Sequence, residues 1–145
     1  MESKEKLIEL LKKQVAVEKT NVKEVGETEK KVGFAAAKLF LNIIRLDSRK
    51  HMEILNGIMQ VLDGIPPGKT LWEHQVDSYI DPFVVQRELE NHMSREAEMI
   101  RHVEKEIKQT QDEGLKLLLQ HIANDEKKHH EILESVTNHL HRVNP

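Results

Sequence analysis

Residues 125–133 read DEKKHHEIL, and residues 47–55 read DSRKHMEIL. The two stretches agree at six of nine positions. The same offset in residue number pairs similar residues elsewhere, namely Leu11 with Leu89, Glu18 with Glu96, Val22 with Ile100 and Val25 with Val103. The chain therefore consists of two copies of one unit, and each copy has a glutamate at the same distance before a histidine, Glu18 before His51 and Glu96 before His129.

Each copy has the apolar spacing of two amphipathic helices. In the first copy, apolar residues recur every three or four positions at Leu7, Leu11, Val15, Val22, Val25, Phe40, Ile43, Ile54, Ile58 and Leu62. In the second copy the same spacing runs through residues 85–107 and 115–140. Gly33 and Gly114 fall where each copy must turn, so each copy is predicted to be a helical hairpin.

The segment between the copies contains strong signals for the end of one helix and the start of another. Two glycines and two prolines within residues 63–68 end the first hairpin, and Asp81-Pro82 favours a new helix start. We therefore predict an all-α fold with a hairpin at about 3–63, a crossover at about 64–81 and a second hairpin at about 82–142.

The composition restricts the class of protein. The length of 145 residues predicts a single domain over 1–145. The 22 basic and 25 acidic residues give a net charge of −3 without a concentrated basic face, so we expect no nucleic-acid partner. With no apolar run of about 18 residues and a polar start, we expect no membrane partner and a cytoplasmic location. The absence of cysteine excludes thiolate metal sites and cysteine nucleophiles.

Polar residues interrupt the apolar faces at equivalent places in the two copies. Glu18 and Glu96 are expected at one level of a helix bundle with His51 and His129. A carboxylate within an apolar face is costly unless it is hydrogen-bonded, paired or bound to metal. Glu126 precedes His129 by three residues, so both side chains can reach one ion, and this mixture of ligands suits iron, manganese or zinc. A network of carboxylates and histidines without metal is the alternative.

These residues carry a family resemblance. One glutamate from each of two helices, plus a Glu-x-x-His motif from each of the other two, is the pattern of ferritin-like di-iron carboxylate four-helix bundles. The chain resembles the rubrerythrin branch of that superfamily, without its rubredoxin domain, over essentially its whole length. The resemblance implies a ferritin-like four-helix bundle with two iron ions, and it makes Glu18, His51, Glu96, Glu126 and His129 metal ligands.

The second helix departs from this pattern. Ser48 stands three residues before His51, where the family has a glutamate that tends to bridge the two metals. Glu18, Glu96 and Glu126 alone bring three negative charges against four positive charges on two divalent ions. Asp47 is therefore a further candidate ligand. Three outcomes stay open: repair of the site by Asp47, an asymmetric or mononuclear site, and loss of metal.

The resemblance implies reduction of peroxide or dioxygen by ferrous iron, as in a peroxidase or ferroxidase. Such a redox cycle requires an external electron donor, because a chain without cysteine has no rubredoxin centre of its own. The main alternative is a non-catalytic helical bundle with a degenerate or mononuclear metal site. A third hypothesis is hydrolysis at a dinuclear zinc or manganese site. The duplication is compatible with one bundle per chain and with a homodimer that exchanges hairpins.

Overall fold

The computed structural model describes residues 3–76 and 81–143, and its side chains as far as residue 140. Four helices make up the chain: α1 (Lys4–Lys31), α2 (Ala35–Gly64), α3 (Pro82–Gln109) and α4 (Glu113–Val143). The described ranges contain no β-strand. The predicted all-α fold, with two repeated helical hairpins and a long connection between them, is confirmed. Residues 77–80 of the predicted crossover lie outside the described residues.

Side-chain caps start three of the helices where the sequence changes from loop to helix. Ser3 accepts a hydrogen bond from the backbone N–H of Lys6 at the start of α1, and Asp81 accepts one from Phe83 at the start of α3. Asp112 accepts from Leu115 at the start of α4. Each cap satisfies a backbone donor that has no partner within the helix.

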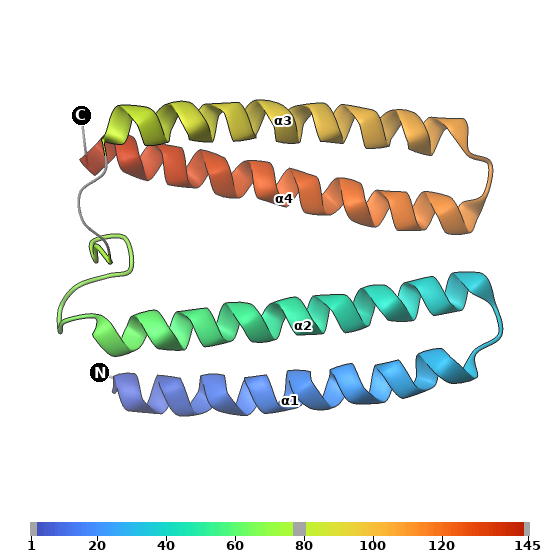
Figure 1. The fold of residues 1–145 in the computed structure, drawn as a ribbon, viewed down its shortest axis with the longest axis horizontal. Helices are drawn as coiled ribbons and strands as arrows, with labels where there is room; N and C mark the ends of the chain where they lie inside the picture. The colour runs from blue at the N-terminus through green and yellow to red at the C-terminus, as the bar shows by residue number, and fades with distance from the viewer. Residues whose placement is uncertain (1–2, 77–80, 144–145) are drawn as a thin grey trace. The chain divides into compact units, whose positions relative to one another are not determined.

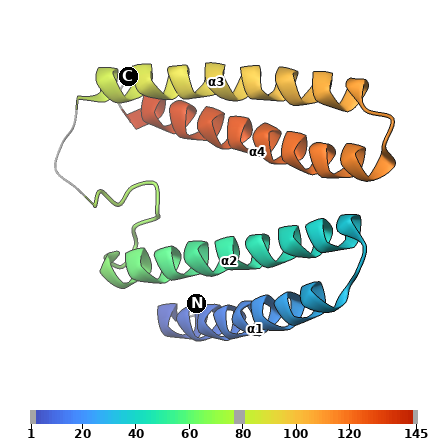
Figure 2. The same ribbon diagram turned by 45° about the vertical axis from the view of Figure 1, so that its right-hand side comes forward.

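The helices form two hairpins, which Figures 1 and 2 show from two directions. In the first, α1 packs antiparallel to α2 after a connection of residues 32–34. In the second, α3 packs antiparallel to α4 after residues 110–112. The chain divides into two compact units between residues 74 and 75, and each unit contains one hairpin.

The helix boundaries repeat with the same offset as the sequence. The first helix of each hairpin begins at Lys4 or Pro82, and the second helix begins at Ala35 or Glu113. Equivalent residues of the two copies therefore occupy equivalent places in the two hairpins. This correspondence allows a residue of one hairpin to be compared directly with its counterpart in the other.

Each hairpin buries few side chains between its own two helices. In the first hairpin these are Ser48 and Leu55, and in the second they are Val103 and Ala123. Both hairpins also expose an apolar face at equivalent positions, formed by Leu39, Ile44 and Ile54 in the first copy and Leu117, Ile122 and Ile132 in the second. Two helices alone can cover only one side of each other, which accounts for this second apolar face.

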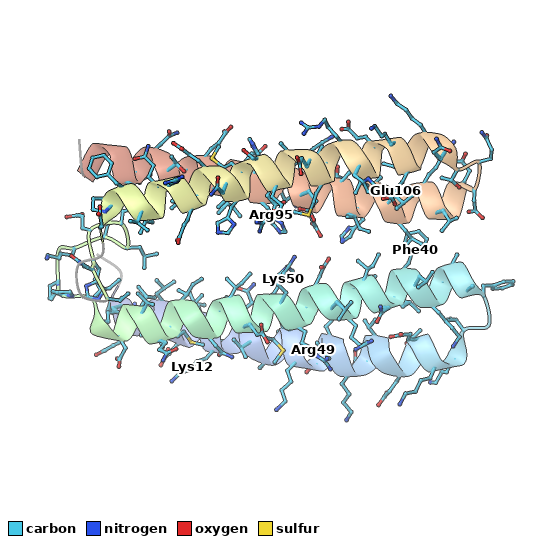
Figure 3. The ribbon with its side chains drawn as sticks, turned by 45° about the horizontal axis from the view of Figure 1, so that its top comes forward. Lys12, Phe40, Arg49, Lys50, Arg95 and Glu106 are labelled. Atoms are coloured by element: carbon cyan, nitrogen blue, oxygen red, sulfur yellow. The ribbon has the colours of Figure 1, made fainter. Side chains whose placement is uncertain are left out.

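Charged side chains occupy much of the remaining helix surface. Figure 3 draws them as sticks, and Lys12, Lys50 and Arg95, which it labels, are all exposed. None of the described helices combines the length and the apolar character needed to cross a membrane.

Candidate metal centre

Three metal-ligating groups converge in the second hairpin. Glu96 extends from α3, and Glu126 and His129 extend from consecutive turns of α4. His129 Nδ1 lies 3.7 Å from Glu96 Oε2 and 3.6 Å from Glu126 Oε2. The packing of α3 against α4 supplies the first distance, and the three-residue spacing within α4 supplies the second.

These separations are close to those between ligand atoms of one ion. Two atoms that each bind iron or zinc at about 2.1 Å lie roughly 3.0–3.6 Å apart at usual coordination angles. Glu96 Oε2 and Glu126 Oε2 are inaccessible to solvent and accept no hydrogen bond from the described part of the chain. A buried carboxylate oxygen without a partner is costly, so a cation at this point would satisfy both atoms.

The electrostatics of the cluster also favour a cation. The Glu96 carboxyl, which would accept a hydrogen bond from Glu126 once Glu126 is protonated, raises the pKa of Glu126 together with burial and the negative charge of Glu96, and His129 opposes this effect. Two carboxylates this close repel each other when both are ionised. A divalent ion would relieve the repulsion by attracting both charges.

An open pocket on the second hairpin gives access to the cluster. Glu96 and His129 line it together with His92, Arg95, Met99, Ile132 and Leu133. Glu96 is 16% exposed and Glu126 is 17% exposed, whereas His129 is about half exposed. An ion or a small oxidant could therefore approach from the histidine side.

The first hairpin contains the equivalent glutamate–histidine pair. His51 Nδ1 lies 3.4 Å from Glu18 Oε2, and Glu18 is 17% exposed. Glu18 Oε2, like the Oε2 atoms of Glu96 and Glu126, is shielded from solvent and accepts no hydrogen bond from the described residues. The structure thus brings Glu18 and His51 together, as their spacing in the sequence predicts.

Ser48 occupies the position equivalent to Glu126, but its surroundings differ. It is 5% exposed, and its Oγ accepts a hydrogen bond of 2.8 Å from Asn21 Nδ2. Asn21 is a residue that sequence reasoning did not single out. In the sequence, Asn21 stands out only as a polar residue about one helical turn after Glu18, at the position where the second copy has the apolar Met99.

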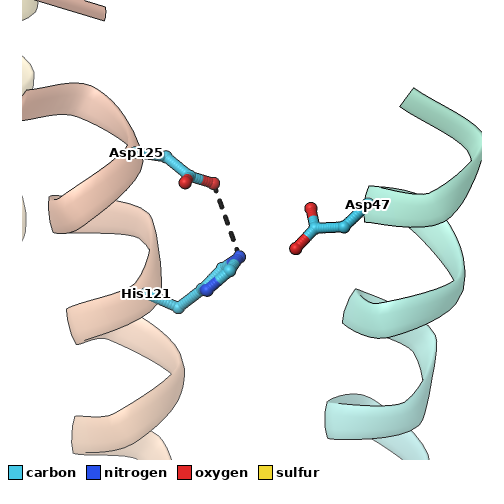
Figure 4. Close-up of side chains that lie close together, drawn as sticks. All are labelled: Asp47, His121 and Asp125. Atoms are coloured by element: carbon cyan, nitrogen blue, oxygen red, sulfur yellow. Dashed lines mark ion pairs between the residues drawn. The ribbon is translucent and has the colours of Figure 1, made fainter. Parts of the chain in front are cut away.

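Asp47, the other candidate ligand, lies one residue before Ser48. Its Oδ1 is 3.6 Å from Lys50 Nζ of the same helix. Its counterpart Asp125 pairs with His121, whose Nε2 is 3.4 Å from Asp125 Oδ2; the dashed line in Figure 4 marks this ion pair. The residue before each ligand position is thus held by a cation or histidine on its own helix.

The family of the chain follows from a match over most of its length. The family profile described as Rubrerythrin matches residues 9–137. The chain belongs to the rubrerythrin family. No curated protein and no solved structure matches it.

Membership of the rubrerythrin family fits the repeated hairpins and the glutamate–histidine pairs. The fit to the metal centre of such proteins differs between the two copies. The second hairpin supplies three ligand atoms, whereas the first supplies Glu18 and His51 and has the neutral Ser48 as its third group. The residues therefore fit one ion in the second hairpin better than they fit a symmetric pair.

Proposed function

We propose that this member of the rubrerythrin family binds a redox-active metal, iron in the first place, through Glu96, Glu126 and His129. The observation that carries the proposal is the convergence on His129 Nδ1 of two buried carboxylate oxygens that accept no hydrogen bond from the described residues. The ligand set of two carboxylates and one imidazole suits iron, with manganese and zinc as the alternatives.

Each residue has a definable part in the proposed function. Bound iron would supply electron transfer to peroxide or dioxygen. Glu96 and Glu126 would neutralise the charge of a divalent ion, and the imidazole of His129 would bind in its neutral form through Nδ1. The half-exposed edge of His129 would leave a path for a small oxidant. An external electron donor would complete a peroxidase or ferroxidase cycle, since the chain has no cysteine for a second redox centre.

The first hairpin supplies the remaining proposed ligands. Glu18 and His51 form the counterpart of the Glu96–His129 pair, and Asp47 is the nearest carboxylate to Ser48 along the chain. We include all three as candidates whose contribution is measured separately. Substitution of each, with metal content as the readout, decides which of them binds.

The direct test is metal analysis after anaerobic loading with Fe(II) and removal of free ions by gel filtration. We expect the wild type to retain iron, and Glu96→Gln and Glu126→Gln to lose most of it. Glu88→Gln is a matched control, because Glu88 is an exposed glutamate of the same helix α3. Retention of iron by both ligand variants at the wild-type level would refute the proposed site.

The redox part of the proposal has its own measurement. Wild-type protein mixed with Fe(II) and hydrogen peroxide should show an absorbance change from oxidation of Fe(II), at least tenfold slower in Glu126→Gln at equal total iron. Iron binding without any faster oxidation than in the variant would favour the non-catalytic bundle. A colourless zinc or manganese protein inert to peroxide would favour the hydrolytic hypothesis.

A further inference from the structure

We infer that this chain holds one metal ion rather than two. In the first hairpin, Ser48 stands at the position equivalent to Glu126, and its buried hydrogen bond with Asn21 leaves no ligand there for a second ion. The inference rests on the proposed function, since it concerns the number of ions that the same protein binds. It differs from the dinuclear centre that the resemblance of the sequence implies.

The repeat places a serine in the first hairpin where the second has a glutamate. Ser48 and Glu126 are equivalent positions of the two copies, and each precedes the histidine of its helix by three residues. In the second hairpin this position brings Glu126 Oε2 to 3.6 Å from His129 Nδ1. In the first hairpin the same position holds a hydroxyl, and that hydroxyl is engaged by Asn21 Nδ2 at 2.8 Å.

Ser48 is buried together with its hydrogen bond. At 5% exposure, the Ser48 side chain lies within the packing of α1 against α2, and its donor Asn21 is also half-buried. Because the two neutral side chains are hydrogen-bonded to each other, their buried polar atoms do not need an ion as a partner. The second hairpin has the opposite property, because Glu126 Oε2 is buried without any hydrogen-bond partner among the described residues.

The ligand groups of the two hairpins also differ in negative charge. Glu96 and Glu126 together match the charge of one divalent ion, with neutral His129 as a further donor. Within the described part of the first hairpin, Glu18 is the only carboxylate paired with His51, so a divalent ion held by this pair would keep an uncompensated positive charge. Such a charge in a partly buried place is unfavourable.

Asp47 is not placed as Glu126 is. It precedes His51 by four residues rather than three, and its Oδ1 lies 3.6 Å from Lys50 Nζ. Its shorter side chain would have to give up this ion pair and approach from another angle. The structure therefore provides a complete set of ligands in one copy and an incomplete set in the other.

The experiment counts bound ions, with Fe(II) alone as the probe. Iron per chain is measured by elemental analysis after anaerobic loading and gel filtration, for the wild type, Ser48→Ala, Ser48→Glu and the double variant Asn21→Met with Ser48→Glu. The double variant gives the first hairpin the residues of the second at both positions. Circular dichroism and thermal unfolding establish which variants are folded.

We expect one ion per chain in the wild type and in Ser48→Ala, and two in the double variant or in Ser48→Glu. Two ions in the wild type would overturn the inference and leave the proposed function intact. One ion in both folded glutamate variants would also overturn it, because Ser48 would then not be the cause. Less than a tenth of an ion in the wild type would refute the proposed function itself. If neither glutamate variant folds, the wild-type count alone decides.

Discussion

Glu126, a proposed metal ligand, destabilises the metal-free protein. Its carboxyl is held against Glu96, which together with burial raises its pKa above the ordinary value. The native state therefore binds a proton at Glu126 more tightly than the unfolded state does. This group lowers the stability of the metal-free protein at neutral pH, and the penalty disappears as the pH falls through the raised pKa.

We therefore expect Glu126→Gln to stabilise the protein in the presence of a chelator. The gain in free energy of unfolding should be about 0.5–1 kcal/mol at pH 7 and should shrink towards pH 5. Urea unfolding of the wild type and the variant at both pH values measures it, with Glu88→Gln as the control. A variant less stable than the wild type at pH 7 would contradict this account of the cluster.

The Asn21–Ser48 hydrogen bond allows a second measurement on single residues. Removal of either partner leaves the other, buried Ser48 or half-buried Asn21, without its hydrogen bond, at a cost of about 1–2 kcal/mol. Removal of both should cost less than the sum, by about 1 kcal/mol. Urea unfolding of Asn21→Ala, Ser48→Ala and the double variant gives this coupling, and strictly additive costs would show that the bond contributes nothing.

At this scale the sequence predicted which glutamate and histidine lie close together better than it predicted the residues around them. The spacing of Glu18 and His51 was sufficient, because both lie on apolar faces where a charged group needs an explanation. Asn21 carried no such signal. A polar residue at the edge of an apolar face is common, and only the packing of α1 against α2 brings it to Ser48.

At the scale of helices, two glycines differ in whether an alanine in their place would stabilise the fold. Gly57 lies within α2, and a Cβ there would meet no atom within 4 Å. Gly68 lies in the connection after α2 with a φ of +84°, a conformation that side chains disfavour.

We expect Gly57→Ala to raise the free energy of unfolding by about 0.5–1 kcal/mol, since alanine loses less backbone entropy than glycine in a helix. Gly68→Ala should lower it, because of the positive φ. Thermal unfolding of both variants tests the pair. Equal effects of the two substitutions would show that the backbone conformation is not what distinguishes them.

Helix limits were predictable at capping residues but not at every glycine, since Gly114, expected in the turn, lies in the first turn of α4. Asp81-Pro82 starts α3 as expected, with the Asp81 side chain as the cap. The start of α2 follows Phe34, which makes no side-chain cap, so no sequence signal marked it to the residue. Its position follows from the three-residue connection after α1 and from the packing of the two helices.

For the molecule as a whole, a metal that joins α3 to α4 should stabilise the folded chain. A ligand that binds only the native state adds about 2.7 kcal/mol when its free concentration is 100 times its dissociation constant. We expect the melting temperature to rise with added Fe(II) under anaerobic conditions and to fall again with a chelator. Glu126→Gln should show neither change, and a similar rise in that variant would place the binding elsewhere.

The two repeated hairpins were predictable at this scale because the apolar spacing of each helix occurs twice in the sequence. Each helix pattern could be checked against its counterpart in the other copy. The difference in chemistry between the copies was harder to predict. Ser48 alone left repair, asymmetry and loss of metal open, and the hydrogen bond from Asn21 is the observation on which we propose asymmetry.

The two short connections, at residues 32–34 and 110–112, also bear on how the chain comes to fold. Each helix packs against its neighbour along the chain, and such local contacts allow rapid folding. A ribosome releases the chain from its N-terminus, so the first hairpin can close while the second is still being synthesised. Glu96, Glu126 and His129 all belong to the second hairpin, so the proposed metal site can form only after the first hairpin has left the ribosome.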